Sequence, residues 1–282
     1  MSDAAGVSST AADAAGEQGA GQAHSAHREA GAQVPAASAT VPLLQLSGVH
    51  TRIGSYHILH GVDLAVPRGA LTMLLGRNGA GKTTTLRTIM GLWRATEGSI
   101  VFDGGDLSRM PTADIARQGI AYVPESMGIF SDLTVKENMV LAARHARTSD
   151  DIDGKRLEWI FDLFPPIRKF WLHPAGKLSG GQKQMLAVAR AIVEPRKLLL
   201  IDEPSKGLAP AIIANMIAAF RELKGTDCTI LLVEQNFNFA RQLGDTVAVM
   251  DDGRIVHRGL MAELAFDEAL QMRLLGLSLA AH

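Results

Sequence analysis

The chain has 282 residues, of which 47% are hydrophobic and 20% are charged, a balance typical of a globular protein with one large domain or two small ones. Its formal net charge of −1 gives no indication of a nucleic-acid partner or an acidic membrane surface. No window approaches the ~18 uninterrupted apolar residues of a membrane-spanning helix, and the single cysteine, Cys228, excludes an intramolecular disulfide.

Residues 1–42 differ in composition from the rest of the chain, because Ala, Gly, Ser, Gln and Thr dominate them. Such a segment buries too little apolar surface to offset its chain entropy, so we predict a disordered tail there. The segment also lacks the basic start and the apolar core of a secretory signal. We expect the folded domain to span residues 43–282.

The first folded segments alternate apolar and polar residues at 43–53 and again at 62–66, which predicts two strands. A short apolar run at 71–75 predicts a third strand, and the residues at 84–93 have helical spacing. A further strand is predicted at 99–107, where a glycine-rich turn signal follows the apolar residues.

The second half of the chain changes its periodicity twice. From about residue 111 to residue 190 the spacing is mostly helical, which predicts a helical subdomain. Strand-like apolar runs return at 197–202, 229–234 and 246–253, with helical stretches between them. Strands that alternate with helices predict a largely parallel sheet with helices on both faces. The C-terminal stretch 269–279 predicts an end helix packed on the core.

A glycine-rich loop lies between the third strand and the first helix, and it matches the P-loop pattern. Its residues are Gly76, Arg77, Asn78, Gly79, Ala80, Gly81, Lys82, Thr83 and Thr84. The glycines allow successive N–H groups to turn toward phosphates, and the helix that begins at Lys82 adds the positive end of its dipole. The ammonium of Lys82 is suited to contact the outer phosphates, and the hydroxyl of Thr83 is suited to ligate Mg²⁺.

A second glycine-rich motif, LSGGQ, opens the helical stretch that follows residue 178. Ser179 is a natural N-cap residue, and Gly180 and Gly181 leave the N–H groups of the first helical turn accessible before Gln182. Taken alone, this motif predicts a well-capped helix whose positive end is open to an anion.

A third motif, LLLIDEP, is an apolar strand that ends in two carboxylates, Asp202 and Glu203. A carboxylate at the end of a buried strand is suited to the coordination shell of Mg²⁺, and its neighbour is suited to orient or deprotonate an attacking water. In order and in spacing, the three motifs resemble the ATP-binding cassette family over residues 43–275.

The resemblance implies an α/β fold with a P-loop NTPase (RecA-like) core, an antiparallel β subdomain and an α-helical signature subdomain. It also implies that two cassettes face each other head to tail. Each ATP would then lie between the P-loop of one subunit and the signature of the other, which corresponds here to Ser179, Gly180, Gly181 and Gln182. The cofactors implied are ATP and Mg²⁺.

Three positions depart from the commonest cassette pattern. Glu125 stands where a glutamine usually contacts Mg²⁺ and the membrane subunit, and its carboxylate can still join a magnesium shell. Gln235 follows a strand where many cassettes have a histidine, and its amide cannot shuttle a proton, which leaves Glu203 as the candidate base. At the position of the aromatic residue that stacks on adenine, either Ile53 makes a weaker apolar contact or Tyr56 replaces it.

The segments around Glu125 and Gln235, together with IFSDLTVKEN and EPSKGLAP, resemble one ATPase subunit of importers for branched-chain amino acids. This resemblance implies a second ATPase subunit, two membrane permeases, an extracytoplasmic solute-binding protein and no nucleic acid. It also implies a peripheral location on the cytoplasmic face of the inner membrane. The surface that contacts the permeases is expected near residues 125–134, and Lys206 is expected to be a solvated turn residue.

Other interpretations stay open from the residues alone. The same machine could carry urea or short amides, because that close relative shares most of these motifs. A soluble cassette ATPase belongs to another class, and the single cassette with ordinary spacing between Lys82 and Ser179 counts against it. Among the histidines, His57 and His60 are three apart in a strand-like segment, so we expect them on opposite faces.

Overall fold

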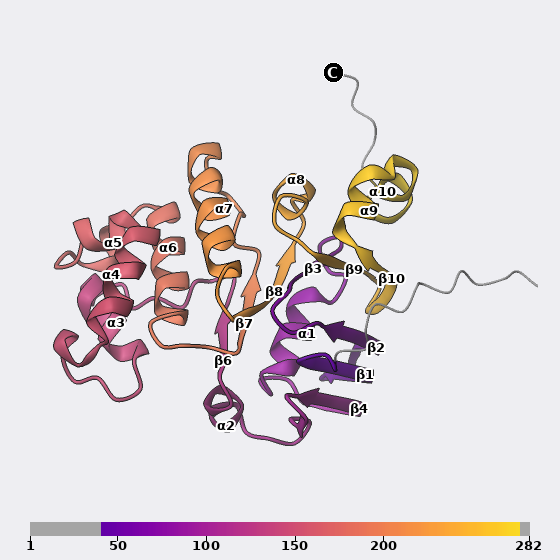
Figure 1. Ribbon diagram of the computed structural model, residues 1–282. Helices are drawn as coiled ribbons and strands as arrows, with labels where there is room; N and C mark the ends of the chain where they lie inside the picture. Colours follow the sequence, from indigo (N-terminus) through magenta and orange to yellow (C-terminus); the bar gives the residue numbers. More distant parts are fainter. Residues whose placement is uncertain (1–40, 277–282) are drawn as a thin grey trace, which may run out of the picture. The chain divides into compact units, whose positions relative to one another are not determined.

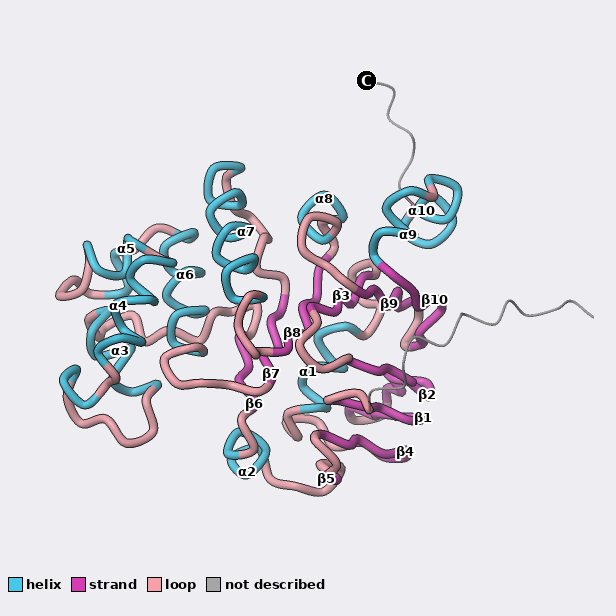
Figure 2. The backbone as a smooth tube through the Cα atoms, viewed as in Figure 1, coloured by secondary structure: helices cyan, strands magenta, loops and turns pink. Residues whose placement is uncertain are grey.

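The computed structural model describes residues 41–276, which form two β-sheets and the helices packed around them (Figures 1 and 2). All but the last two residues of the tail predicted at 1–42 lie outside the described part, as do the last three residues of the predicted end helix. The strands are β1 Leu44–Ile53, β2 Tyr56–Val66, β3 Leu71–Leu75, β4 Ala95–Phe102, β5 Gly105–Asp106, β6 Ile120–Val123, β7 Leu198–Asp202, β8 Thr229–Glu234, β9 Thr246–Asp251 and β10 Arg254–Leu260.

The helices are α1 Lys82–Ile89, α2 Thr112–Arg117, α3 Val135–Ala142, α4 Gly154–Leu163, α5 Pro165–Lys169, α6 Gly180–Ala191, α7 Pro210–Lys224, α8 Phe237–Ala240, α9 Met261–Phe266 and α10 Glu268–Leu275. Two short 3₁₀ turns lie at Ser149–Asp151 and Ala175–Lys177. The end helix predicted at 269–279 therefore appears as α10, which packs on the core through partly buried leucines.

The smaller sheet is antiparallel, in the order β2-β1-β4-β5. Its β1–β2 register shifts where Thr51 pairs with Leu59 and Arg52 pairs with His57, so Ile58 is an additional residue in β2. The irregularity brings the rings of His57 and His60 to 4.1 Å between centroids. The prediction that these two histidines lie on opposite faces is wrong, because it assumed a regular strand.

The larger sheet has the order β10-β9-β3-β8-β7-β6. The five strands from β9 to β6 are parallel, and β10 is an antiparallel edge strand, which confirms the predicted largely parallel sheet. The interval 111–190 was expected to be mostly helical, but it also contributes β6, which pairs with β7. Four residues are too few to establish a period against the helical pattern on either side.

Helices cover both faces of the larger sheet because successive strand residues point to opposite sides. In β7, Leu199 and Ile201 join the core cluster that contains α6 and α7, while Leu198 and Leu200 join the cluster that contains α1 and the smaller sheet. Figure 1 shows α1 beside both sheets, so the second cluster fills the space between them.

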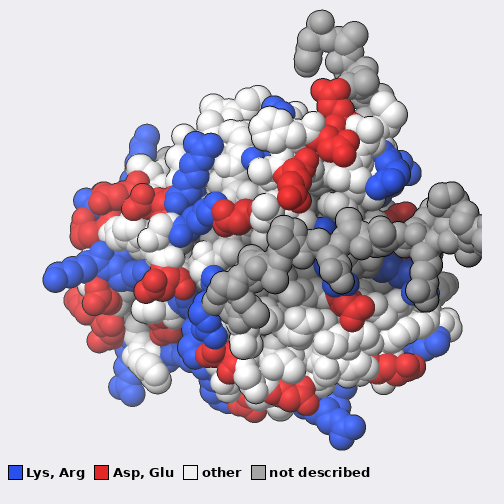
Figure 3. All heavy atoms as spheres, turned by 45° about the vertical axis from the view of Figure 1, so that its right-hand side comes forward, with Lys and Arg blue, Asp and Glu red and all other residues white. Residues whose placement is uncertain are grey.

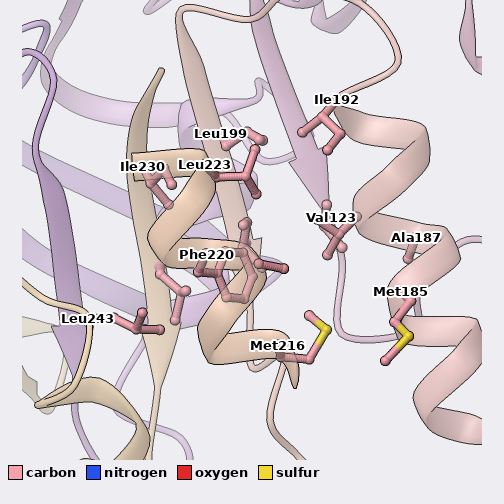
Figure 4. Packing of buried hydrophobic residues seen from close by; sticks show 14 of the residues in the cluster. Val123, Met185, Ala187, Ile192, Leu199, Met216, Phe220, Leu223, Ile230 and Leu243 are labelled. Atoms are coloured by element: carbon pink, nitrogen blue, oxygen red, sulfur yellow. The ribbon is translucent and has the colours of Figure 1, made fainter. Parts of the chain in front are cut away.

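Helix α7 contributes buried side chains to the first cluster (Figure 4). Met216, Phe220 and Leu223 point from this helix toward the sheet, where Leu199 and Ile230 lie. Phe220 is fully buried and meets the ring of Phe239 edge to face, with 6.2 Å between the centroids. This packing fixes α7 over the sheet that contains β7, and the carboxylates of Asp202 and Glu203 lie at the end of β7.

The surface carries both signs of charge in alternation. On the face shown in Figure 3, Lys and Arg are interspersed with Asp and Glu over the described atoms. Within residues 41–276, none of the helices combines the length and the apolar character needed to span a membrane. Cys228 is buried, and this burial raises the pKa of its thiol to about 11, so the thiol stays protonated and inert.

We predict that Phe220→Ala lowers the free energy of unfolding by about 3–5 kcal/mol, because it leaves a cavity between α7 and the sheet. Urea unfolding followed by circular dichroism measures the change. Phe266→Ala is the matched control, since Phe266 is 89% exposed and its loss is expected to change stability by less than about 0.5 kcal/mol. Similar losses for both variants would contradict the assignment of Phe220 to the core.

Candidate nucleotide site

Four strands of the larger sheet end at the same edge, and the predicted site residues follow them. β3 ends before the P-loop, β8 ends before Gln235, β7 ends before Glu203 and β6 ends two residues before Glu125. Because β3, β8, β7 and β6 are parallel neighbours, their carboxyl ends lie side by side. Residues that are far apart in the sequence are brought together in this way.

The P-loop leads directly into α1 and folds around its own lysine. Gly81 precedes α1 with φ of 105°, a conformation that favours glycine, and a Cβ there would lie 3.0 Å from Leu59 Cδ2. Lys82 is 3% exposed, and its ammonium donates to the carbonyl oxygens of Gly76 at 2.8 Å and Arg77 at 2.9 Å. The buried charge is therefore held at the loop that the sequence predicts to bind phosphate.

Asp202 lies beneath the P-loop and is fully buried. Its carboxylate accepts a hydrogen bond from the hydroxyl of Thr83 at 3.0 Å and one from the hydroxyl of Tyr122 at 3.4 Å. Burial is the main cause that raises the pKa of Asp202, and the charges of Glu203 and Glu125 add to it, while the hydrogen bond from Thr83 opposes it. Burial also raises the pKa of Tyr122 to about 12, so its hydroxyl remains a donor.

These oxygen donors are chemically suited to Mg²⁺. Mg²⁺ prefers hard oxygen ligands, and the hydroxyl of Thr83 and the carboxylate of Asp202 already lie within hydrogen-bonding distance of each other. A divalent cation at this position would also favour the ionised form of Asp202, which burial disfavours. The residues present therefore fit the metal that the sequence predicts.

Glu203 adopts an uncommon backbone conformation at the end of β7. Its φ of 47° lies in the left-handed region, which for a residue other than glycine costs energy and occurs often at functional sites. Its N–H donates to the carbonyl of Val233 at 2.9 Å, which holds the residue against β8. The carboxylate lies 3.5 Å from the ammonium of Lys82 and accepts a hydrogen bond from the amide of Gln235 at 2.6 Å.

Gln235 connects the P-loop to Glu203, because its amide also donates to the side-chain oxygen of Asn78 at 2.5 Å. The residue before it, Glu234, was not among the predicted site residues. Its buried carboxylate accepts N–H groups from Ser205 at 2.9 Å, Gln235 at 3.1 Å and Asn236 at 3.2 Å, and burial raises its pKa. Glu234 therefore fixes the loops after β7 and β8. The only signal for it in the sequence is an acidic residue at the end of an apolar strand.

A cavity of about 360 Å³ opens above the P-loop. Its lining includes Asn78, Gly79, residues 81–84, Glu125 and Glu203, which are all among the residues predicted from the sequence. Ile58 and Lys206 also line it, and neither was among the predicted site residues.

The two candidates for the adenine contact, Ile53 and Tyr56, lie at the hairpin between β1 and β2 and outside the lining of this cavity. Tyr56 is 73% exposed. The apolar side chain that the smaller sheet does contribute to the cavity is Ile58, the additional residue of the irregular β2.

The signature residues form the start of α6 and lie outside the lining of the P-loop cavity. Ser179 and Gln182 form a reciprocal capping box, in which each side chain accepts the backbone N–H of the other. Gly181 has no room for a side chain, because a Cβ would lie 2.6 Å from Ile212 of α7, whereas the space around Gly180 is open. The first turn of α6 therefore presents an accessible backbone at Gly180.

A larger groove of about 860 Å³ lies beside the site. Its lining includes Trp93, Tyr122, Met127 and Arg190. Because Tyr122 belongs to β6 and Met127 follows Glu125, the chain segment around Glu125 forms one wall of the groove. Arg190 donates to the carbonyl of Gly128 at 2.5 Å and lies 5.2 Å from the ring centroid of Phe130. Its Nε is buried and has no hydrogen-bond partner among residues 41–276. Tyr122 lines this groove and contacts Asp202, so the groove and the site share a wall.

Comparison with known proteins identifies the family. A family model described as ABC transporter matches residues 59–206. The chain is 39% identical over 234 residues to the high-affinity branched-chain amino acid transport ATP-binding protein BraG of Pseudomonas aeruginosa, which covers 83% of this chain and 100% of that protein. It is 36% identical over 224 residues to the probable branched-chain amino acid transport ATP-binding protein LivF of Archaeoglobus fulgidus, which covers 78% of this chain and 93% of that protein.

Solved structures agree with the sequence comparison. The ATP-binding subunit of an ABC transporter, 28% identical, aligns over 84% of this chain and 96% of its own with a TM-score of 0.69. An ATP-binding cassette of an ABC transporter in its ADP conformation, 25% identical, aligns over 82% of this chain and 97% of its own with a TM-score of 0.68. The chain belongs to the ABC transporter family, as an ATP-binding subunit, and it is an ATPase.

We predict that Asp202→Asn is more stable than the wild type by about 1 kcal/mol at pH 8 when no nucleotide or Mg²⁺ is present. Burial raises the pKa of Asp202 above its unfolded value, so the native wild type loses stability as the pH rises through that pKa. The neutral variant has no such loss, and its advantage disappears as the pH falls toward about 4.

Urea unfolding between pH 4.5 and pH 8 measures this difference. Asp162→Asn is the matched control, because it is the same substitution at a side chain that is 83% exposed. An Asp202→Asn variant that is less stable by the same amount at every pH would show that hydrogen bonding at this position outweighs desolvation.

Proposed function

We propose that this chain is the ATP-hydrolysing subunit of an importer for branched-chain amino acids, bound peripherally at the cytoplasmic face of the inner membrane. The observation that carries the proposal is the 39% identity to BraG, which extends over the whole length of that protein. Relatives named for the import of methionine, ribose or glutamate are also similar, at 28–34% identity. The solute therefore requires a direct test.

In the proposed mechanism, two ATPase subunits pair head to tail, and each ATP is held by the P-loop of one and Ser179–Gln182 of the other. Two features support this arrangement: the signature residues lie outside the P-loop cavity of their own chain, and the start of α6 is accessible at Gly180. The positive end of the α6 dipole would face the γ-phosphate across the interface. The second subunit is either another copy of this chain or a similar ATPase.

Within one site, Lys82 exchanges the carbonyls of Gly76 and Arg77 for the outer phosphates of ATP. Thr83, Asp202 and Glu125 are the residues that would hold Mg²⁺, which when bound neutralises charge on the phosphates. Glu203 orients or deprotonates the attacking water, and Gln235 keeps the carboxylate of Glu203 in place through its amide. The amide of Gln235 neither gains nor loses a proton near neutral pH, so acid–base chemistry depends on Glu203.

The groove beside Trp93 and Met127 is the proposed docking place for the two membrane permeases. It shares a wall with the segment of Glu125 and, through Tyr122, contacts Asp202. A permease segment seated there would sense whether the site is closed on ATP. The extracytoplasmic solute-binding protein would deliver the amino acid to the permeases and would not touch this chain.

We predict that Glu203→Gln binds ATP with Mg²⁺ but hydrolyses it at least about 10²-fold more slowly, because the base is lost while the binding loop is kept. The closed dimer should then accumulate and elute as a dimer in size-exclusion chromatography with ATP. Lys82→Ala is the contrasting variant, since it is expected to lose ATP affinity. Turnover at the wild-type rate in Glu203→Gln would refute the assignment of the base.

We predict that co-expression with its genomic neighbours recovers this chain together with two permeases. In proteoliposomes, the complex should import radiolabelled leucine when ATP and the binding protein are present, because closure of the ATPase dimer drives the permeases. Uptake is measured by filtration, with a Lys82→Ala complex as the inactive control. ATPase activity that is stimulated by urea or short amides instead of leucine would identify a different cargo for the same machine. An active ATPase that is recovered without any permease would refute the importer proposal.

A further inference from the structure

Lys206 lies in the turn after β7, and its exposed side chain makes ion pairs with two carboxylates. Its N–H donates to the carbonyl of Glu203 at 3.2 Å, which closes a turn and brings the side chain back over the P-loop cavity. The ammonium lies 2.6 Å from the carboxylate of Glu125 and 3.5 Å from the carboxylate of Glu203. The side chain is 54% exposed and lies in a turn, as predicted, but the sequence did not indicate these two ion pairs.

The two carboxylates come from different strands and meet at this one ammonium. Glu125 follows β6 and Glu203 follows β7, and β6 and β7 are paired in the sheet. The hydrogen bond to Glu125 and the charge of Glu203 raise the pKa of Lys206, so it stays protonated. Since the side chains of Lys206 and Glu125 are 54% and 43% exposed, the pair adds little to stability, and its importance is positional.

We propose that Lys206 is a stand-in cation, which holds Glu125 and Glu203 in the resting site and is displaced when Mg²⁺ and ATP bind. The proposal rests on the proposed function, in which Glu125 belongs to the magnesium shell. The ammonium of Lys206 and a magnesium ion repel each other when both lie against the carboxylate of Glu125, so the two cations compete for it. Lys206 is thus a positioning residue that sets how much Mg²⁺ the site requires.

The competition has a measurable consequence. When only part of the population has Glu125 free, the apparent affinity for the metal falls by that fraction. Removing the ammonium frees Glu125 in every molecule, so the Mg²⁺ concentration needed for nucleotide binding should fall. A lysine that only orders the loop would have no such effect.

The test measures equilibrium binding of a fluorescent, non-hydrolysable ATP analogue as Mg²⁺ is titrated. In Lys206→Met, the half-saturating Mg²⁺ concentration should fall by about two- to fivefold, the range for the loss of one exposed ion pair. Lys206→Arg keeps the charge and should stay near the wild type. Lys197→Met is the matched control, because Lys197 also makes a 2.6 Å ion pair, with Asp103, and its side chain is 57% exposed.

A double variant separates this inference from the proposed function. Glu125→Ala alone should raise the half-saturating Mg²⁺ concentration, and adding Lys206→Met to it should change nothing further. In one outcome, Glu125→Ala requires more Mg²⁺ than the wild type, while Lys206→Met requires as much as the wild type or more. That outcome overturns the inference on Lys206 and keeps the metal role of Glu125. If Glu125→Ala leaves the Mg²⁺ requirement unchanged, the metal role of Glu125 is overturned together with the inference.

Discussion

The parallel pairing of β3, β8, β7 and β6 is the constraint on which the whole site depends. Each of these strands is short and apolar, and each ends in a different loop. Because neighbouring strands that run in the same direction end on the same side, the loops that follow them all lie at one edge of the sheet. Both hydrophobic clusters maintain this pairing, since α7 covers one face of the strands and α1 covers the other. Packing remote from this edge thus sets the distances between the groups that are proposed to be catalytic.

Charged side chains are concentrated at that edge of the sheet, where their burial would be unfavourable without hydrogen-bond or ion-pair partners. Lys82, Asp202 and Glu203 are all nearly or fully buried. A buried charge must be paired or hydrogen-bonded, and here the loop carbonyls, Thr83 and Gln235 supply the contacts. Each of these contacts is one that phosphate, metal or water can replace. In the proposed function, these buried charges would gain new partners when ATP binds.

Local patterns predicted a large share of this organisation. The P-loop, the signature and the Asp202–Glu203 pair are continuous segments whose chemistry can be read without knowing the fold. The continuous apolar runs predicted the central parallel strands for the same reason. What could not be predicted depends on pairing between strands. Ile58 reaches the P-loop cavity because the β1–β2 register is irregular. No periodicity in the sequence predicts such a register shift.

Lys206 shows the same limit at the site itself. From the sequence it is one polar residue in a loop, 81 positions from Glu125, and a solvated turn is the simplest interpretation. The β6–β7 pairing brings the two loops together, and the left-handed conformation of Glu203 with the turn that follows directs the lysine toward Glu125. The substitution of a carboxylate for the usual glutamine at 125 then acquires a partner of opposite charge. A departure from the family pattern and a loop lysine, which seem unrelated in the sequence, form in the fold one ion pair at the mouth of the P-loop cavity.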